Sequence, residues 1–402
     1  MMVRHLRRSR VFNRLGQASF VGAGALALSI AIAPNAAQAQ ETIKIGVPVP
    51  LSGSYSTAGK DILNGAQLAA SDINAKGGVL GKKIELVPED DKCDADAAAG
   101  AAQALVEKGV VAVAGGYCSS AALPELRVFH GAGLAYVMDA STNPELTEKS
   151  WDGAFRTIGR DDEQGPFAAK FMKEVLHAKS VAVINDNTTY SKGLADNTVE
   201  ALKQQGLDVV YNDAVTPGQM DYADAAKAVA ELKPDVVYYT GYYPEAALLA
   251  KDVRELKLPV KYLMGGDGTT DPTLIQTAGP AAKGMICTTA PLPQFLTSAK
   301  ARRFVADYKK AYPDRMPGPY SIYEYDAVSV VAKAIADAKS AKPADIIAAL
   351  HKVSNFEGAT GDITFNEKGD RTNAVYMAVI AEGGHFKPYR KLASNGSWVT
   401  PK

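Results

Sequence analysis

The sequence predicts an α/β protein built from two doubly wound lobes that are joined by a three-segment hinge. Short apolar, β-branched runs alternate with Ala-rich amphipathic segments from residue 42 onward, a pattern typical of parallel sheets covered by helices on both faces. There are more predicted strands than a single doubly wound sheet usually contains, and three passages interrupt the alternation of strands and helices. A length of 402 residues also agrees with about two or three domains.

The predicted strands are continuous apolar runs, as in VVAVAGG and VVYYTG, which favours burial on both faces of a sheet. They are residues 42–48, 84–88, 110–117, 135–138, 181–186, 209–215, 235–240, 261–265 and 284–289. The predicted helices between them are residues 57–74, 94–108, 164–176, 191–205, 221–232 and 244–256.

Three passages interrupt this alternation, and each predicts a crossing between lobes. Residues 151–165 are polar and contain glycine, residues 288–294 carry Pro and Thr, and after residues 356–362 the sequence favours short strands without long helices. Two such lobes meet at a cleft lined by the carboxyl ends of their strands, where doubly wound folds bind ligands. The predicted boundaries are 41–160 plus 291–358 for lobe 1, and 161–290 plus 359–402 for lobe 2.

Residues 1–39 have the three parts of a secretory signal peptide. A basic start precedes the apolar run 20–33, and Ala37-Gln38-Ala39 provides the cleavage site. A membrane anchor is the alternative, but a span needs about 20 apolar residues and this run is shorter. Arg7-Arg8 also forms a twin-arginine pair, so both export routes stay open. The basic residues of this segment are Arg4, Arg7, Arg8, Arg10 and Arg14.

Export changes the charge balance and the interpretation of the cysteines. Subtracting those five arginines from 44 basic residues leaves 39 against 44 acidic residues, a net charge of −5, and no broad basic surface for nucleic acid. An oxidising compartment allows Cys93 and Cys118 to pair. Cys287, within GMICTTA, is expected to be a buried apolar side chain. No CxxC or His-rich cluster indicates a metal, and we expect no cofactor.

Hydroxyl groups follow two strands of the first half. Ser119 and Ser120 come after strand 110–117 at the start of a predicted helix, where free backbone N–H groups can bind a carboxylate. Thr142 follows strand 135–138 and can add a donor to the same anion. The alternatives are plain N-capping for the serines and an Asn-Pro turn without a ligand around Thr142.

Aromatic and acidic side chains follow the strands of the second half. Tyr190, Tyr242 and Tyr243 lie in strand-to-helix loops, and Asp267 stands between two glycines after strand 261–265. An aspartate in such a place is often only a turn residue. Together the two halves supply an anion site and a carboxylate, which predicts that an α-amino acid zwitterion binds between the lobes.

At these residues the sequence resembles the type I periplasmic binding proteins of ABC transporters, especially the leucine/isoleucine/valine-binding proteins. The resemblance covers nearly the whole chain after residue 41. Its motifs are IKIGVPVPLSGSYSTAG, GAQLAASDINAKGGVLGKKIELVPEDDKCD, YCSSAALPE, STNPELT, DNTTYSKGLA, VVYYTGYYPE and GGDG.

The resemblance implies roles for individual residues. It implies a Cys93–Cys118 disulfide, and a ligand carboxylate held by Ser119, Ala140 and Thr142. From the second lobe it implies Tyr190, Tyr242 and the ammonium partner Asp267.

The chain departs from the family pattern at several of these positions. Asp267 replaces a longer glutamate, Tyr117 replaces a leucine beside the ligand side chain, and Tyr55 stands three residues before Ala58, where the family often has tyrosine. Tyr320, near the hinge, is a further candidate for the side-chain pocket.

The resulting hypothesis is a periplasmic receptor that binds a branched-chain or related neutral amino acid. It would act as a monomer and deliver the ligand to an ABC permease in the inner membrane. An exported sensor or receptor for amides or similar ligands on the same fold is the alternative. An enzyme is disfavoured because the sequence has no GxSxG, P-loop or HExxH motif, and we expect no catalytic residues.

Overall fold

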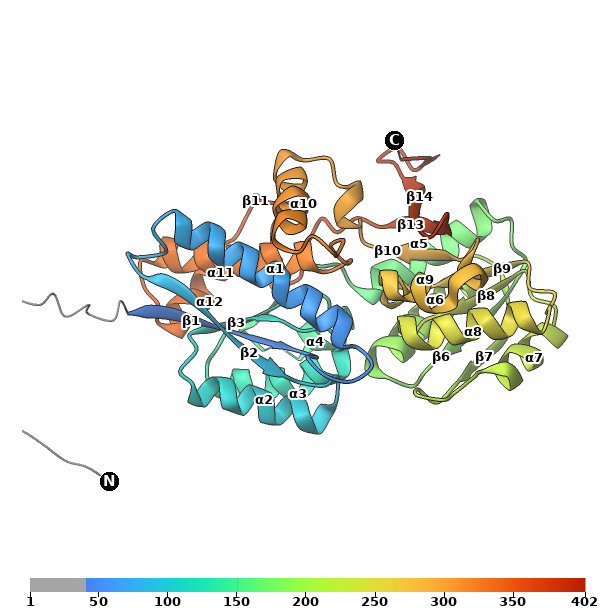
Figure 1. The fold of residues 1–402 in the computed structure, drawn as a ribbon, viewed down its shortest axis with the longest axis horizontal. Helices are drawn as coiled ribbons and strands as arrows, with labels where there is room; N and C mark the ends of the chain where they lie inside the picture. The colour runs from blue at the N-terminus through green and yellow to red at the C-terminus, as the bar shows by residue number, and fades with distance from the viewer. Residues whose placement is uncertain (1–40, 150, 402) are drawn as a thin grey trace, which may run out of the picture. The chain divides into compact units, whose positions relative to one another are not determined.

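The computed structural model describes residues 41–149 and 151–401. The predicted signal peptide, residues 1–39, lies outside the described residues. The described part of the chain forms two large sheets and one small one, flanked by helices, so the predicted α/β class is confirmed (Figure 1). None of the described helices is long and apolar enough to cross a lipid bilayer.

The first sheet is parallel throughout, in the order β2-β1-β3-β4-β5. Alternate residues of its strands face opposite helix layers: Val113 and Tyr136 pack with residues of α2 and α3, whereas Ala114 and Val137 pack with residues of α1 and α11. Figure 1 shows these two helix pairs on opposite sides of the strands. The strands are β1 Thr42–Val49, β2 Lys83–Asp90, β3 Ala112–Gly115, β4 Tyr136–Met138 and β5 Ala154–Arg156. The helices are α1 Ser56–Ala75, α2 Ala95–Glu107, α3 Ser119–Gly131, α4 Glu145–Glu148, α10 Ala299–Ala311, α11 Ser321–Ala338 and α12 Pro343–Leu350.

The second sheet has the order β15-β14-β13-β10-β9-β8-β6-β7, with β13, β14 and β15 antiparallel to their neighbours. Val181 and Val183 pack with residues of α5 and α6, whereas Ala182 and Ile184 pack with residues of α8. The parallel strands are β6 Ser180–Asn185, β7 Asp208–Ala214, β8 Val236–Tyr239, β9 Tyr262–Gly265 and β10 Ile286–Thr289. The remaining strands are β13 Met377–Glu382, β14 His385–Leu392 and β15 Trp398–Val399. The helices are α5 Asp161–Glu174, α6 Thr189–Gln204, α7 Ala223–Glu231, α8 Tyr243–Glu255 and α9 Pro272–Ala278.

Short elements complete the fold. The 3-10 turns are η1 Asp267–Thr269, η2 Gly279–Ala282 and η3 Pro293–Phe295, and β11 Phe356–Gly358 pairs with β12 Gly361–Ile363 in a small antiparallel sheet. From β11 onward the described elements are all strands, which agrees with the change of sequence texture near residues 356–362.

The structure adds helices α9 to α12 to the predicted set and differs from the prediction in the passage before α5. The polar passage 151–165 contains β5, a three-residue strand, and α5 begins at Asp161, before the predicted start at residue 164. Three residues are too few to show a strand periodicity, and Asp161, Asp162 and Glu163 make the first turn of α5 polar. The polar passage that interrupts the sequence pattern therefore consists of β5, a short connection and the first turn of α5.

Candidate functional site

The carboxyl ends of β3 and β4 carry the hydroxyl groups predicted to bind an anion. Ser119 is the first residue of α3, fully buried, and its Oγ accepts a hydrogen bond from the Asn143 backbone N–H at 3.3 Å. The N-cap residue is Cys118, with no side-chain capping bond, so the capping interpretation of Ser119 is wrong. The first turn of such a helix also presents backbone N–H groups without intrahelical partners.

The loop after β4 brings Ala140 and Thr142 to the same place. Both residues are buried, and the Thr142 hydroxyl oxygen has no ordinary hydrogen-bond partner among the described residues. A buried hydroxyl that is left without a partner is unfavourable. Thr142 is therefore a group to which a ligand could add a hydrogen bond.

A buried arginine that the sequence analysis missed supports this loop. Arg156, in β5, donates from Nη1 to the carbonyl oxygens of Ser141 (3.1 Å) and Asn143 (3.2 Å). Its Nε lies 2.7 Å from Asp370 Oδ1, and Arg160 Nη1 donates to Asp370 Oδ2 at 2.6 Å. Because Asp370 is more than two hundred residues further along the chain, no local pattern indicates this network.

The disulfide between Cys93 and Cys118 is present, with the two Cα atoms 5.3 Å apart. It ties the segment after β2 to the N-cap of α3. The backbone N–H of Cys93 also donates to Asp91 Oδ1 at 2.8 Å. Cys287, by contrast, is fully buried and free, and burial raises the pKa of its thiol to about 12, as expected for an apolar packing residue.

Asp267 lies in η1, after β9, and is buried. Its Oδ1 accepts a hydrogen bond from the Tyr190 hydroxyl at 2.7 Å, and its Oδ2 accepts one from the Tyr320 hydroxyl at 3.0 Å. The Gly268 backbone N–H donates to the Tyr190 oxygen at 3.0 Å, and a Cβ on Gly268 would lie 2.9 Å from the Tyr190 ring. Burial raises the pKa of Asp267, while the two tyrosine hydroxyls oppose that shift.

A second acid, Asp161, lies near this carboxylate. It begins α5 and is fully buried, and neither carboxylate oxygen has an ordinary hydrogen-bond partner among the described residues. Burial raises the pKa of Asp161 well above its usual range, the charge of Asp267 raises it further, and the nearby Thr142 hydroxyl lowers it. The sequence analysis missed Asp161 because acids in the first turn of a helix are common and usually only face the helix dipole.

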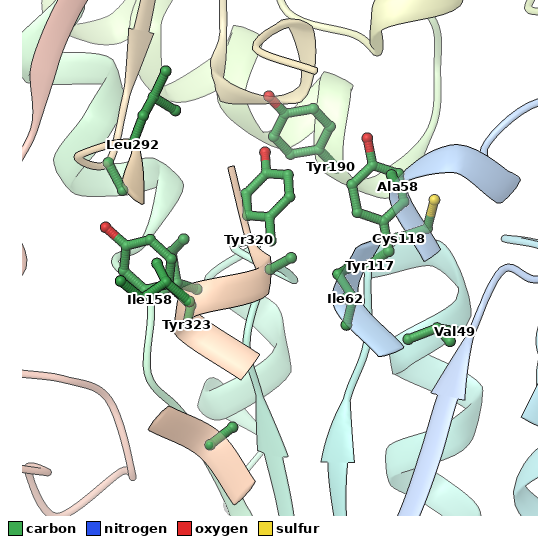
Figure 2. Close-up of a cluster of buried hydrophobic side chains, with 14 of the residues drawn as sticks. Val49, Ala58, Ile62, Tyr117, Cys118, Ile158, Tyr190, Leu292, Tyr320 and Tyr323 are labelled. Carbon is green, nitrogen blue, oxygen red and sulfur yellow. The ribbon is translucent and has the colours of Figure 1, made fainter. Parts of the chain in front are cut away.

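Tyr117 and Tyr242 face each other from the two sheets. Their ring centroids are 5.4 Å apart, Tyr242 is 5.0 Å from Tyr190, and Tyr117 is 5.6 Å from Tyr320. Figure 2 shows Tyr117, Tyr190 and Tyr320 pointing in a similar direction from different elements. Tyr55 also joins the group, with its ring 4.9 Å from that of Tyr242.

Two further hydrogen bonds join the loops of the two sheets. Asn143 Nδ2 donates to the Thr189 carbonyl at 2.7 Å, and the Tyr243 hydroxyl donates to the Ser54 carbonyl at 2.9 Å. All seven residues predicted to bind a ligand are thus buried, at strand ends whose loops are in mutual contact: Tyr117, Ser119, Ala140, Thr142, Tyr190, Tyr242 and Asp267. Their roles toward a ligand stay predictions.

Two cavities, of about 360 and 210 Å³, are lined by other residues. The larger lies among α1, α10, α11 and β11, and the smaller beside η3 and β13. Neither contains any of the buried side chains that lack hydrogen-bond partners. Within residues 41–149 and 151–401, no group of three or more His, Cys, Asp or Glu side chains is arranged to hold a metal ion.

Comparison with known proteins gives consistent matches. A family model described as periplasmic binding protein matches residues 42–385. The leucine-specific-binding protein of Salmonella typhimurium is 33% identical over 330 residues, which are 82% of this chain and 88% of that protein.

Solved structures give the same result. A leucine binding protein, LivK, from Thermotoga maritima is 30% identical with a TM-score of 0.82, and the match covers 90% of this chain and 99% of that one. LivJ from Streptococcus pneumoniae, solved in complex with isoleucine, is also 30% identical with a TM-score of 0.80, covering 86% of this chain and 98% of that one.

Proposed function

Because this chain belongs to the family of periplasmic binding proteins, we propose that it is the solute-binding protein of an ABC importer. It binds a neutral amino acid, branched-chain or related, and delivers it to a permease in the inner membrane. The leucine-binding and isoleucine-bound relatives support this ligand class. The family is one of solute-binding proteins and not of enzymes.

The observation that carries the proposal is the pairing of a buried anion site with buried carboxylates. Ser119, the first turn of α3 and the buried Thr142 hydroxyl, which lies near Asp161, supply donors for a ligand carboxylate. Asp161 and Asp267 supply negative charge for a ligand ammonium, and the charge of Asp267 raises the pKa of Asp161, which shows that the two carboxyl groups lie near each other. A zwitterion would satisfy both sets of groups, as burial of charge requires.

We assign the ammonium to Asp161 together with Asp267. Both Asp267 oxygens already accept hydrogen bonds from tyrosine hydroxyls, whereas both Asp161 oxygens are free of ordinary partners. Asp267 then contributes its charge and holds Tyr190 and Tyr320 in place. Asp161 is the acceptor available for a direct N–H···O contact.

The proposed organisation follows the sequence prediction. Residues 1–39 are a signal peptide that sends the protein to the periplasm, residues 41–160 plus 291–358 form lobe 1, and residues 161–290 plus 359–402 form lobe 2. The strands of the first large sheet lie within residues 42–156, and those of the second lie within residues 180–289 and 377–399, which supports this division. We further propose that the protein acts as a monomer whose lobes close on the ligand by hinge motion.

Titration calorimetry with the twenty amino acids tests the proposal. We expect a neutral amino acid to bind, and Asp161→Asn to weaken its binding at least tenfold, because an amide cannot neutralise the ammonium. Asp196→Asn, an exposed change on α6, is the control and should leave affinity unchanged. Absence of binding by every amino acid would refute the function, and unchanged affinity in Asp161→Asn would refute the ammonium assignment.

A further inference from the structure

Tyrosine rings surround the groups that would hold the ligand's α-carbon. We call Tyr55, Tyr117, Tyr190, Tyr242 and Tyr320 the tyrosine cluster. Tyr117 contacts the rings of Tyr55, Tyr242 and Tyr320 at centroid distances of 6.2, 5.4 and 5.6 Å. The hydroxyls of Tyr190 and Tyr320 donate to Asp267, whereas those of Tyr117 and Tyr242 make no hydrogen bond to it.

The hydroxyl groups of the tyrosine cluster differ in their hydrogen-bond partners. Those of Tyr190 and Tyr320 donate to Asp267. Those of Tyr117 and Tyr242 are buried, with 3% and 2% of each residue exposed, and have no hydrogen-bond partner among the described residues. A buried hydroxyl without a partner is unfavourable, and an apolar ligand side chain would leave both in that condition.

The electrostatic surroundings keep both hydroxyls protonated. Burial raises the pKa of Tyr242 well above its usual range, and the charges of Asp186, Asp267 and Asp161 raise it further. Burial also raises the pKa of Tyr117 well above its usual range, and the charge of Asp271 raises it further. Each hydroxyl can therefore both donate and accept, and the surrounding negative charge opposes a ligand with an acidic side chain.

We propose that Tyr117 and Tyr242 select an amino acid whose side chain ends in a neutral hydrogen-bonding group, a hydroxyl or an amide, over an aliphatic side chain of the same shape. The inference rests on the proposed function and narrows its ligand class from branched-chain or related neutral amino acids to the related ones with a polar side chain. A polar pocket of this kind discriminates strongly against an analogue that lacks the hydrogen-bonding group, because the pocket's own polar groups then stay unpaired. An apolar pocket lacks that penalty.

Amino acids of matched shape provide the test with the wild-type protein. Titration calorimetry should show threonine binding at least tenfold more tightly than valine, and asparagine at least tenfold more tightly than leucine. Valine equal to or tighter than threonine, together with leucine equal to or tighter than asparagine, overturns the inference while leaving the proposed function intact. Tighter binding of lysine or arginine than of every neutral amino acid also overturns it, and failure of all amino acids to bind refutes the proposed function as well.

Two variants test whether the preference for polar side chains depends on the hydroxyls of Tyr117 and Tyr242. Tyr117→Phe and Tyr242→Phe keep the rings and remove the hydroxyls, so each should reduce the polar-over-aliphatic preference at least fivefold, mainly by weakening the polar ligand. Tyr211→Phe, in β7, is the control for loss of a phenol elsewhere and should keep the wild-type preference. Circular dichroism confirms that each variant is folded, and an unchanged preference in both cluster variants refutes the assignment to these residues.

Discussion

On the first sheet, the loops that carry Ser119 and Thr142 are held by covalent and ionic links, whereas the second sheet presents Tyr190, Tyr242 and Asp267 on loops without such links. The Cys93–Cys118 disulfide fixes the start of α3, and the buried Arg156–Asp370 pair fixes the loop after β4. Contacts between the two sides include the hydrogen bond from Asn143 to Thr189, the ring contact of Tyr117 with Tyr242 and, from the N-cap of α11, the hydrogen bond of Tyr320 to Asp267. We call the side that carries Ser119 and Thr142 the rigid side, because covalent and ionic links constrain its loops. The side that carries Tyr190, Tyr242 and Asp267 is joined to it by weaker, noncovalent contacts.

The largest expected effect comes from removing the ionic support of the rigid side. Arg156→Met removes one of the positive charges that neutralise the Asp370 carboxylate. It also removes the hydrogen bonds from Arg156 to the carbonyl oxygens of Ser141 and Asn143. Loss of one partner of a buried ion pair costs about 3–5 kcal/mol of unfolding free energy. Denaturant unfolding followed by circular dichroism measures it. Arg127→Met, an exposed change on α3, is the control, and equal stability of the two variants would show that the loop is not held by Arg156.

An intermediate effect is expected from the bonds between the two sets of loops. Tyr320→Phe removes a hydrogen bond to a buried carboxylate, and hydrogen bonds to charged groups are worth about 1.5–3 kcal/mol. Tyr243→Phe removes a bond to the neutral Ser54 carbonyl, which is worth about 1 kcal/mol. Calorimetric affinities for the bound amino acid should therefore fall more in Tyr320→Phe than in Tyr243→Phe. The reverse order would show that Asp267 does not organise the site.

The site residues at the ends of strands could be predicted from the sequence, whereas the buried charged residues beside them could not. Tyr117, Thr142 and Asp267 lie at the ends of predicted strands or within four residues of them. Because the carboxyl ends of parallel strands meet at one edge of a sheet, the local pattern predicts that these residues lie close together. Arg156 and Asp161 lie in the passage between two strand-helix series, and nothing local separates them from ordinary surface charge. Their significance comes from burial and from distant partners, which only the folded chain supplies.

The same limit applies to the acids beneath the rigid loops. Asp139 directly precedes Ala140, Glu324 is on α11, and both are fully buried, with all four carboxyl oxygens lacking hydrogen-bond partners among the described residues. Burial raises the pKa of each well above its usual range, the charge of Asp139 raises the pKa of Glu324 further, and the charge of Asp61 raises that of Asp139. No pattern in the sequence distinguishes these two acids from solvated ones.

This pair predicts an effect of a different kind, a dependence of stability on pH. The folded protein keeps a proton that the unfolded chain releases above about pH 4.5, so stability is full below that pH and falls as pH rises toward the folded pKa. The slope is up to about 1.4 kcal/mol per pH unit for each retained proton. Glu324→Gln cannot ionise, and its free energy of unfolding should therefore fall less between pH 5 and pH 8 than that of the wild type. Glu231→Gln, exposed on α7, should keep the wild-type slope, and a wild-type slope in Glu324→Gln would mean that the pair is ionised in the folded protein. Since the other buried acids are common to both proteins, the difference in slope isolates the contribution of Glu324 and of its interaction with Asp139.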